Sequence, residues 1–187
     1  MRRNIYSQRP EDDDEEMKEE LNDILKHYHP DIVSQHWMEE RYCILERRQY
    51  KIDVNTTDGF EVGVYPYLAK KACSLIHRYY CPPDTTLPDY AIANLNRLAN
   101  EAIHLYNSKE GSNYTVVRVI KTMTEVASGT WYYMTFQASL PFRRCPCRTF
   151  EAKLFEHLPF PRSYIHIEFV RLKIEAGGSS MMHQQPT

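Results

Sequence analysis

Cysteine is the residue of this chain best suited to redox, nucleophilic or metal chemistry. Cys145 and Cys147 flank a proline in the run RRCPCR. Nearby positive charge lowers the pKa of a thiol and favours its reactivity, so a redox or metal role is one interpretation. A metal site would need two more ligands at suitable spacing, and the neighbouring sequence lacks them. A surface loop with two free thiols is the simpler interpretation.

Histidine spacing does not predict a ligand set either. His27 and His29 are two residues apart and His36 lies further on, so they do not share one face of a helix and we expect them to be solvated. His157 lies near a predicted hairpin, where it could contact a partner. His166 alternates along a predicted strand and is interpreted as a residue of a sheet face.

The common catalytic signatures do not occur in the sequence. We find no GxSxG, P-loop, HExxH or dinucleotide fingerprint. A papain-like protease needs a cysteine in its local signature, and none of the five cysteines has that context. We therefore predict a protein that is not an enzyme and needs no cofactor or metal ion.

Charge is unevenly distributed along the 187 residues. Residues 1–58 carry nine Lys and Arg against fifteen Asp and Glu, whereas residues 59–187 carry fourteen against ten. The acid is concentrated in EDDDEEMKEE, Glu11 to Glu20, which is either a solvated segment or a tail that docks on a basic partner. Neither half is basic enough to predict nucleic acid as the main partner.

The sequence predicts neither a signal peptide nor a membrane span. The two arginines of MRRNIYSQRPEDDD are not followed by an apolar core, and no stretch approaches the roughly 18 apolar residues of a spanning helix. The odd number of cysteines without framework spacing indicates free thiols in a reducing compartment. The expected location is therefore the cytoplasm or the nucleus.

The first half of the chain predicts helices joined by irregular segments. The predicted elements are a helix over 15–27, a second helix over 34–48, a linker over 49–60 and an ambiguous segment over 61–82. Residues 1–58 are thus interpreted as an acidic N-terminal extension, partly helical or disordered. Residues 176–187 are interpreted as a flexible tail.

The second half predicts one long helix followed by strands. From Tyr90 to Tyr106, apolar residues recur at helical spacing on one broad face, and Pro88 and Asp89 suit a first turn and a cap. Four later segments are rich in β-branched residues or alternate with period two, and they begin near residues 114, 131, 150 and 164. Short loops favour an antiparallel meander. We therefore predict an α+β fold in which the helix packs on a four- to five-stranded antiparallel sheet.

Three motifs in this order resemble those of the plant cystatins. The helix carries LANEAIHLYN, Leu98 to Asn107, where the plant pattern is Leu-Ala-Arg-Phe-Ala-Val-x-x-His-Asn. EVASGTWYYMT, from Glu125, is similar to Gln-Val-Val-Ala-Gly-Thr-x-Tyr-Tyr-Leu-Thr, and FEAKLF, from Phe150, is similar to Tyr-Glu-Ala-Lys-Val-Trp. The resemblance covers roughly residues 86–173 and implies a cystatin-like domain over 59–175. The extra first half resembles longer, divergent cystatin-related proteins of plants.

The resemblance also implies a partner and a mechanism. A cystatin fills the cleft of a papain-like cysteine protease with an N-terminal trunk and two hairpin loops, and so blocks substrate reversibly and competitively. The implied first-hairpin residues are Glu125, Val126, Ala127, Ser128 and Gly129, and the second-hairpin residues are Pro159 and Phe160. Gly59 and Gly63 are the candidates for a trunk glycine. A monomer is expected, with a domain-swapped dimer as the alternative.

Two departures from the family pattern keep a second function open. Glu125 stands where the family has Gln, which would bring a charge to a desolvated cleft. Ala127 stands where the family has Val, which removes about two methyl groups, or about 1–2 kcal/mol of contact. Gly129 is expected to bend through positive φ. The alternative to inhibition is a non-inhibitory cystatin-fold interaction module, in which Glu125 to Gly129 form only a hairpin turn and binding uses the acidic first half or another sheet face.

Overall fold

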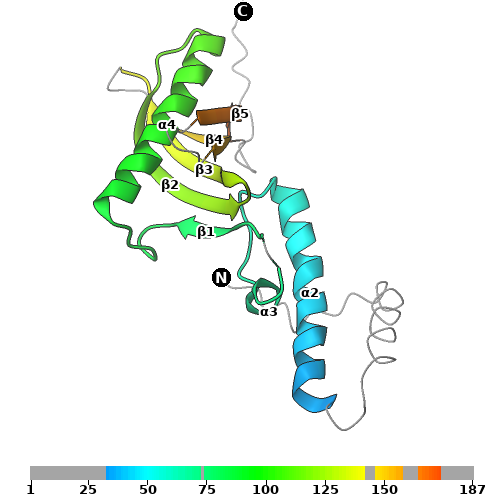
Figure 1. Ribbon diagram of the computed structural model, residues 1–187. Coiled ribbons are helices and arrows are strands. Elements are labelled where there is room, and N and C mark those ends of the chain that lie inside the picture. The colour runs from blue at the N-terminus through cyan, green and yellow to red at the C-terminus, as the bar shows by residue number, and fades with distance from the viewer. Residues whose placement is uncertain (1–32, 73, 142–145, 158–163, 174–187) are drawn as a thin grey trace, which may run out of the picture.

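The computed structural model describes residues 33–72, 74–141, 146–157 and 164–173. Figure 1 shows its elements, which in chain order are α2 (Val33–Thr57), α3 (Pro66–Ala69), β1 (His77–Tyr80), α4 (Asp89–Glu110), β2 (Thr115–Val126), β3 (Gly129–Ser139), β4 (Arg148–His157) and β5 (Tyr164–Leu172). The helix predicted over 15–27 and the tail predicted over 176–187 lie outside the described residues.

The strands form one antiparallel sheet in the order β1-β2-β3-β4-β5. β2 and β3, of 12 and 11 residues, pair along their whole length. β1 was not foreseen within the ambiguous segment over 61–82; it pairs His77 with Thr124 and becomes the fifth strand at the edge of the sheet. The predicted α+β fold, with one long helix on an antiparallel sheet, is confirmed.

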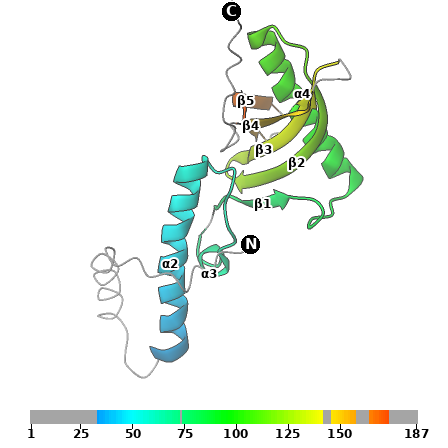
Figure 2. The ribbon, with the colours of Figure 1, turned by 180° about the vertical axis from the view of Figure 1, so that it is seen from behind.

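The helix α4 covers one face of the sheet (Figures 1 and 2). Its apolar stripe, which includes Leu98 and Ala102 at 0% exposure, packs against β3 and β4 side chains such as Phe136. Burial of this stripe, at about 25 cal/mol per Å² of apolar surface, selects the face that the sequence predicts. The helix starts one residue earlier than expected: Pro88 is the extended N-cap residue and Asp89 is the first helical residue, without a side-chain cap.

A second group of elements contacts the opposite face of the sheet at the end where β2 joins β3, and α2 extends past the sheet there (Figure 1). We call it the N-terminal arm; it comprises α2, α3 and residues 58–65 that join them. Phe60, which is 1% exposed, meets the Tyr133 ring edge-on at 5.9 Å and lies 6.1 Å from the Phe169 ring. Because neighbouring residues of a strand point to opposite faces, Tyr133 faces the arm while Tyr132 and Met134 face α4.

The helix α2 is longer than the sequence predicts. It runs through Thr57, so the linker expected over 49–60 is wrong for most of its length. The extra turns are held by contacts with distant residues: the Tyr50 hydroxyl accepts the Ile76 N–H at 3.0 Å, and the Asp53 carboxylate accepts the Gly63 N–H at 2.9 Å. Periodicity did not predict the extension, because these contacts are polar and lie outside the local sequence.

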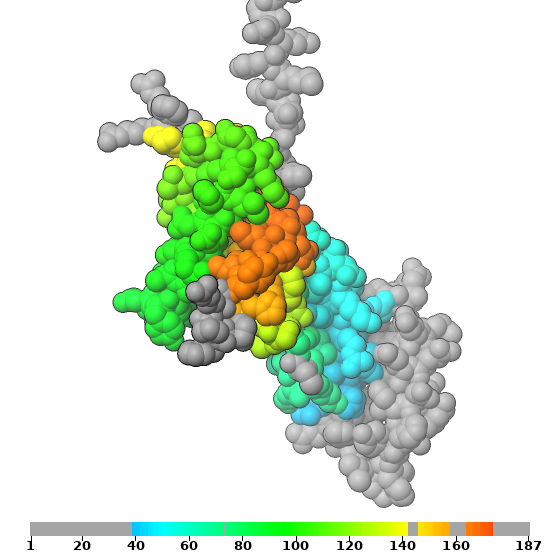
Figure 3. All heavy atoms as spheres, turned by 45° about the horizontal axis from the view of Figure 1, so that its top comes forward, coloured from blue at the N-terminus to red at the C-terminus, as the bar shows by residue number. Residues whose placement is uncertain are grey.

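Ion pairs also join the arm to the sheet. The Glu61 carboxylate lies 2.5 Å from Lys121 Nζ of β2 and 3.4 Å from Lys173 Nζ, and Asp58 pairs with Arg171 of β5 at 2.9 Å. In the space-filling view, the cyan part of the arm lies next to the orange residues of β5 (Figure 3). Such exposed pairs add little stability singly, but together they fix where the arm lies on the sheet.

Candidate functional site

The first hairpin lies at the end of the two longest strands. β2 ends at Val126 and β3 begins at Gly129, so Ala127 and Ser128 form the turn. The Ala127 N–H donates to the Gly129 carbonyl at 2.9 Å. Val126 is 57% exposed and both turn residues are exposed. The predicted first-hairpin residues therefore present a short accessible edge on a rigid support.

Gly129 serves a different purpose from the one expected. Its φ is not in the left-handed region, so the predicted bend through positive φ is wrong. The residue is buried against β4, and a Cβ added there would lie 2.5 Å from both the Glu156 carbonyl oxygen and the Phe155 ring. Glycine is needed because the neighbouring strand approaches too closely for a side chain.

Glu125 is paired within the protein. The Tyr133 hydroxyl donates to its Oε2 at 3.1 Å, and the Ser74 hydroxyl lies 3.5 Å from its Oε1. Burial raises the pKa of Tyr133, and the negative charge and hydrogen bond of Glu125 raise it further. The Glu125 carboxylate thus contacts Tyr133 of the sheet and Ser74 of the segment before β1. These contacts offset the desolvation cost that was predicted for an unpaired charge.

The chain that leads into β1 lies beside the first hairpin. The Ser74 hydroxyl donates to the Val126 carbonyl at 2.6 Å. Further along, His77 of β1 pairs with Thr124, which lies two residues before Val126 in β2. The cystatin resemblance implies that an N-terminal trunk would lie beside this hairpin. The two trunk-glycine candidates lie elsewhere: Gly59 packs against Tyr133 and Ile76, and Gly63 bonds to α2. Sequence reasoning missed Ser74 because 52 residues separate it from Val126.

The second connection begins at the same end of the sheet. Gly129 pairs with His157, the last residue of β4, and His157 pairs with Tyr164, the first of β5. Pro159 and Phe160 come between these strands and lie outside the described residues. Aromatic groups stand close by: the ring of the exposed His157 meets the half-buried Phe155 ring at 4.8 Å, and the Phe155 ring lies 4.8 Å from the half-buried Trp131 ring.

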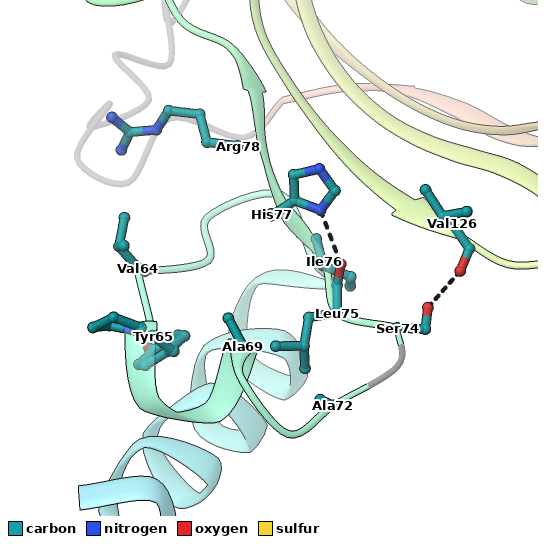
Figure 4. Close-up of a pocket in the computed structure, with 12 residues that line it drawn as sticks. Val64, Tyr65, Ala69, Ala72, Ser74, Leu75, Ile76, His77, Arg78 and Val126 are labelled. Carbon is teal, nitrogen blue, oxygen red and sulfur yellow. Dashed lines mark hydrogen bonds between the residues drawn. The ribbon is translucent and has the colours of Figure 1, made fainter. Parts of the chain in front are cut away.

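A groove of about 420 Å³ opens beside the hairpin, between the arm and β1 (Figure 4). Val64 and Ala69 line one side, Leu75 and Arg78 line the other, and Val126 reaches its end. No sequence pattern predicts this groove, because its walls come from three segments whose contact depends on the folded arm.

The other candidate groups of the sequence remain apart. Cys147 and His166 are exposed, and burial raises the pKa of the Cys43 thiol in α2. Across the described ranges, His, Cys, Asp and Glu side chains form no cluster of three or more suited to a metal ion. None of the described helices combines the length and apolarity needed to cross a membrane.

Comparison with known proteins agrees with the geometry. Residues 85–161 match the family model of the cystatin domain. The chain therefore contains a cystatin-like domain, which includes α4, the first hairpin and β4. Two Arabidopsis thaliana proteins are similar: UPF0725 protein At4g28920, 31% identical over 115 residues, and UPF0725 protein At1g02770, 32% identical over 120 residues. The matches cover 59% and 63% of this chain, but only 36% of each relative.

Proposed function

We propose that the cystatin-like domain is a reversible, competitive inhibitor of papain-like cysteine proteases. The observation that carries the proposal is the edge formed by the exposed residues Val126, Ala127 and Ser128, with Ser74 bonded beside them. The second connection, which holds Pro159 and Phe160, starts next to this edge. The segment before β1, the first hairpin and the end of β4 thus lie at one end of the sheet.

Such an edge inhibits a protease by filling its active-site cleft and so excluding the substrate. The turn is anchored on paired strands, so little conformational entropy is lost when it enters a cleft. Val126 supplies an exposed apolar side chain, whereas Ala127 supplies less contact than the family's Val. A loss of about 1–2 kcal/mol corresponds to roughly tenfold weaker binding. Because Glu125 is paired to Tyr133, its charge adds less to the cost than an outward-facing carboxylate would.

A second candidate function is a non-inhibitory interaction module. The observation that favours it is the direction of the arm: α2, about 37 Å long for its 25 residues, projects past the sheet at the hairpin end (Figures 1 and 2). A protease that takes up the hairpin edge must fit beside this helix. If it does not fit, the fold is a scaffold for a different partner.

Inhibition of papain by the full chain decides between the two candidates. We expect inhibition below about 1 μM, and at least a tenfold loss with Val126→Asp, since a charge would be buried in the cleft. Val117→Asp is the matched control: Val117 is 53% exposed on the same strand, nine residues from Val126, and its variant should inhibit normally. Substitution of Gly129 is avoided because a side chain there disturbs β4.

The outcomes separate cleanly. Absence of inhibition at about 100 μM, with the fold intact by circular dichroism, would exclude the inhibitor and leave the interaction module. Equal inhibition by the chain and by Val126→Asp would show that the hairpin edge is not the contact. Glu125→Gln keeps an acceptor for the Tyr133 hydroxyl and removes the charge, so it should inhibit at least as well as the chain itself.

A further inference from the structure

The groove beside the first hairpin borders an unpaired strand edge. β1 is the first strand in the order of the sheet, so one of its edges pairs with β2, and no described strand pairs with the other. Ile76, Arg78 and His77 of this segment line the groove. The Ile76 N–H points away from β2 to the Tyr50 hydroxyl at 3.0 Å. Backbone groups two residues apart point the same way in a strand, so the Arg78 amide is directed to the free edge.

The walls of the groove are mainly apolar and leave room for side chains. Val64 is 75% exposed, an unusual exposure for an aliphatic residue, and Leu75 is half-buried opposite. The arm side of the wall also includes the small residues Gly63 and Ala69 and the rings of Tyr65 and Pro66. Pockets of this size and composition suit aliphatic ligand groups.

Arg78 is the charged side chain among the residues that line the groove, which include no Lys, Asp or Glu. Two neighbouring carboxylates are engaged within the protein: that of Asp53 accepts the Gly63 N–H, and that of Glu125 accepts the Tyr133 hydroxyl. Arg78 has a weak ion pair with Asp84. The Asp84 carboxylate lies 4.0 Å from Arg78 Nη1, which is the limit of such a contact, and the Asp84 side chain is 71% exposed. Figure 4 shows the Arg78 side chain pointing away from the strand that carries Val126. Arg78 can therefore form a charge-assisted hydrogen bond with a carboxylate of a ligand.

We propose that this groove binds an extended, acidic-apolar segment of a partner protein, which adds as a strand to the free edge of β1. Backbone hydrogen bonds to the strand edge would give affinity, and alternate aliphatic side chains against Val64 and Leu75 would give selectivity. An Asp, a Glu or a terminal carboxylate of the segment pairs with Arg78. The groove shares Ser74 and Val126 with the hairpin edge, but Arg78 and the free edge of β1 lie outside that edge, so substitution of Arg78 tests this binding separately from protease inhibition.

A positional-scanning library of fluorescent hexapeptides, titrated against the full chain by anisotropy, tests the proposal. We expect selection of aliphatic residues at alternate positions together with Asp or Glu. Arg78→Glu should weaken binding of the selected acidic peptide at least tenfold and shift the residues selected from the library toward Lys and Arg. Arg118→Glu makes the same charge change on the exposed side of β2 and should leave binding unchanged. Ala69→Trp, which fills the groove, should abolish binding.

Strand addition has its own readout. Two N-methylated forms of the selected peptide are compared, one methylated at the odd-numbered amides and one at the even-numbered amides. One form should lose binding and the other should keep it, because only every second amide faces the strand edge. No peptide bound below about 1 mM would overturn the proposal. So would N-methylation tolerated at every position, or an Arg78→Glu variant that binds the acidic peptide as well as the chain itself.

Discussion

The first hairpin combines two kinds of residue within five positions. Val126, Ala127 and Ser128 face solvent and are available to a partner, whereas Glu125 and Gly129 are engaged with the sheet. A motif that looks like one recognition element is thus divided into contact residues and supporting residues. The two classes predict different effects of substitution, on binding for the first and on stability for the second.

Gly129→Ala should lower the free energy of unfolding by about 1–3 kcal/mol. The added methyl group would lie 2.5 Å from the Glu156 carbonyl oxygen, a backbone atom, so strand β4 must move. Urea denaturation measures the change. Ser128→Ala, one residue earlier and exposed, is the control and should stay within about 0.5 kcal/mol. Equal stability of the two variants would contradict the packing role of Gly129.

At the scale of elements, the N-terminal arm depends on the sheet for its position. Partial burial raises the pKa of the Glu61 carboxyl, but the hydrogen bond and charge of Lys121, together with Lys173, outweigh this and hold the pKa below its usual 4.5. A carboxyl with a lowered pKa in the folded state stabilises above its unfolded pKa. That stability is lost as the pH falls below 4.5 through the lowered value.

Glu61→Gln should therefore reduce the acid sensitivity of the chain. Between about pH 6 and pH 3, the urea midpoint of the variant should fall less than that of the unchanged chain, because the variant has no carboxyl to protonate at this contact. Glu101→Gln, on the exposed side of α4, is the comparison and should keep the original pH dependence. If the urea midpoints of Glu61→Gln and of the unchanged chain fall in parallel with pH, the ion pair between Glu61 and Lys121 does not contribute to the pH dependence of stability.

The whole molecule is built on both faces of one sheet, and each layer buries tyrosine hydroxyls beside carboxylates. Burial raises the pKa of Tyr132, and Glu156 raises it further on the α4 side. On the arm side, burial and then Glu125 raise the pKa of Tyr133. Within the arm, Tyr65 follows the same rule, with Asp53 as its partner.

Alkaline unfolding should follow from these tyrosines. A group whose folded pKa is raised stabilises fully below its unfolded pKa, near 10 for tyrosine, and this stability is lost as the pH rises further. Above pH 10 we expect the buried tyrosines to ionise only as the fold is lost, seen as coincident changes in near-ultraviolet absorbance and circular dichroism. Tyr133→Phe should lose less stability above pH 10 than the chain itself, whereas Tyr90→Phe, at 79% exposure, should not differ. Ionisation of all tyrosines in the intact fold would refute this.

Local patterns were sufficient for α4 and for strands β2 to β5, but not for β1. The apolar stripe of α4 and the period-two strands could be predicted because each is set by burial of neighbouring residues in one segment. The order of three motifs likewise predicted the domain that the family model matches over 85–161. The sequence alone also predicted a corner at Ala127, Ser128 and Gly129 between two strands, and in the structure Ala127 and Ser128 form the turn.

Only the tertiary structure decided what surrounds that turn. Ser74 meets Val126 across 52 residues, Glu125 is paired to Tyr133, and Gly129 is required by the backbone of Glu156. The last turns of α2 and the groove at β1 likewise depend on the arm packing onto the sheet. Each of these features arises from contacts between segments distant in the chain, and periodicity reports only which face of a segment is buried, not which residues it meets.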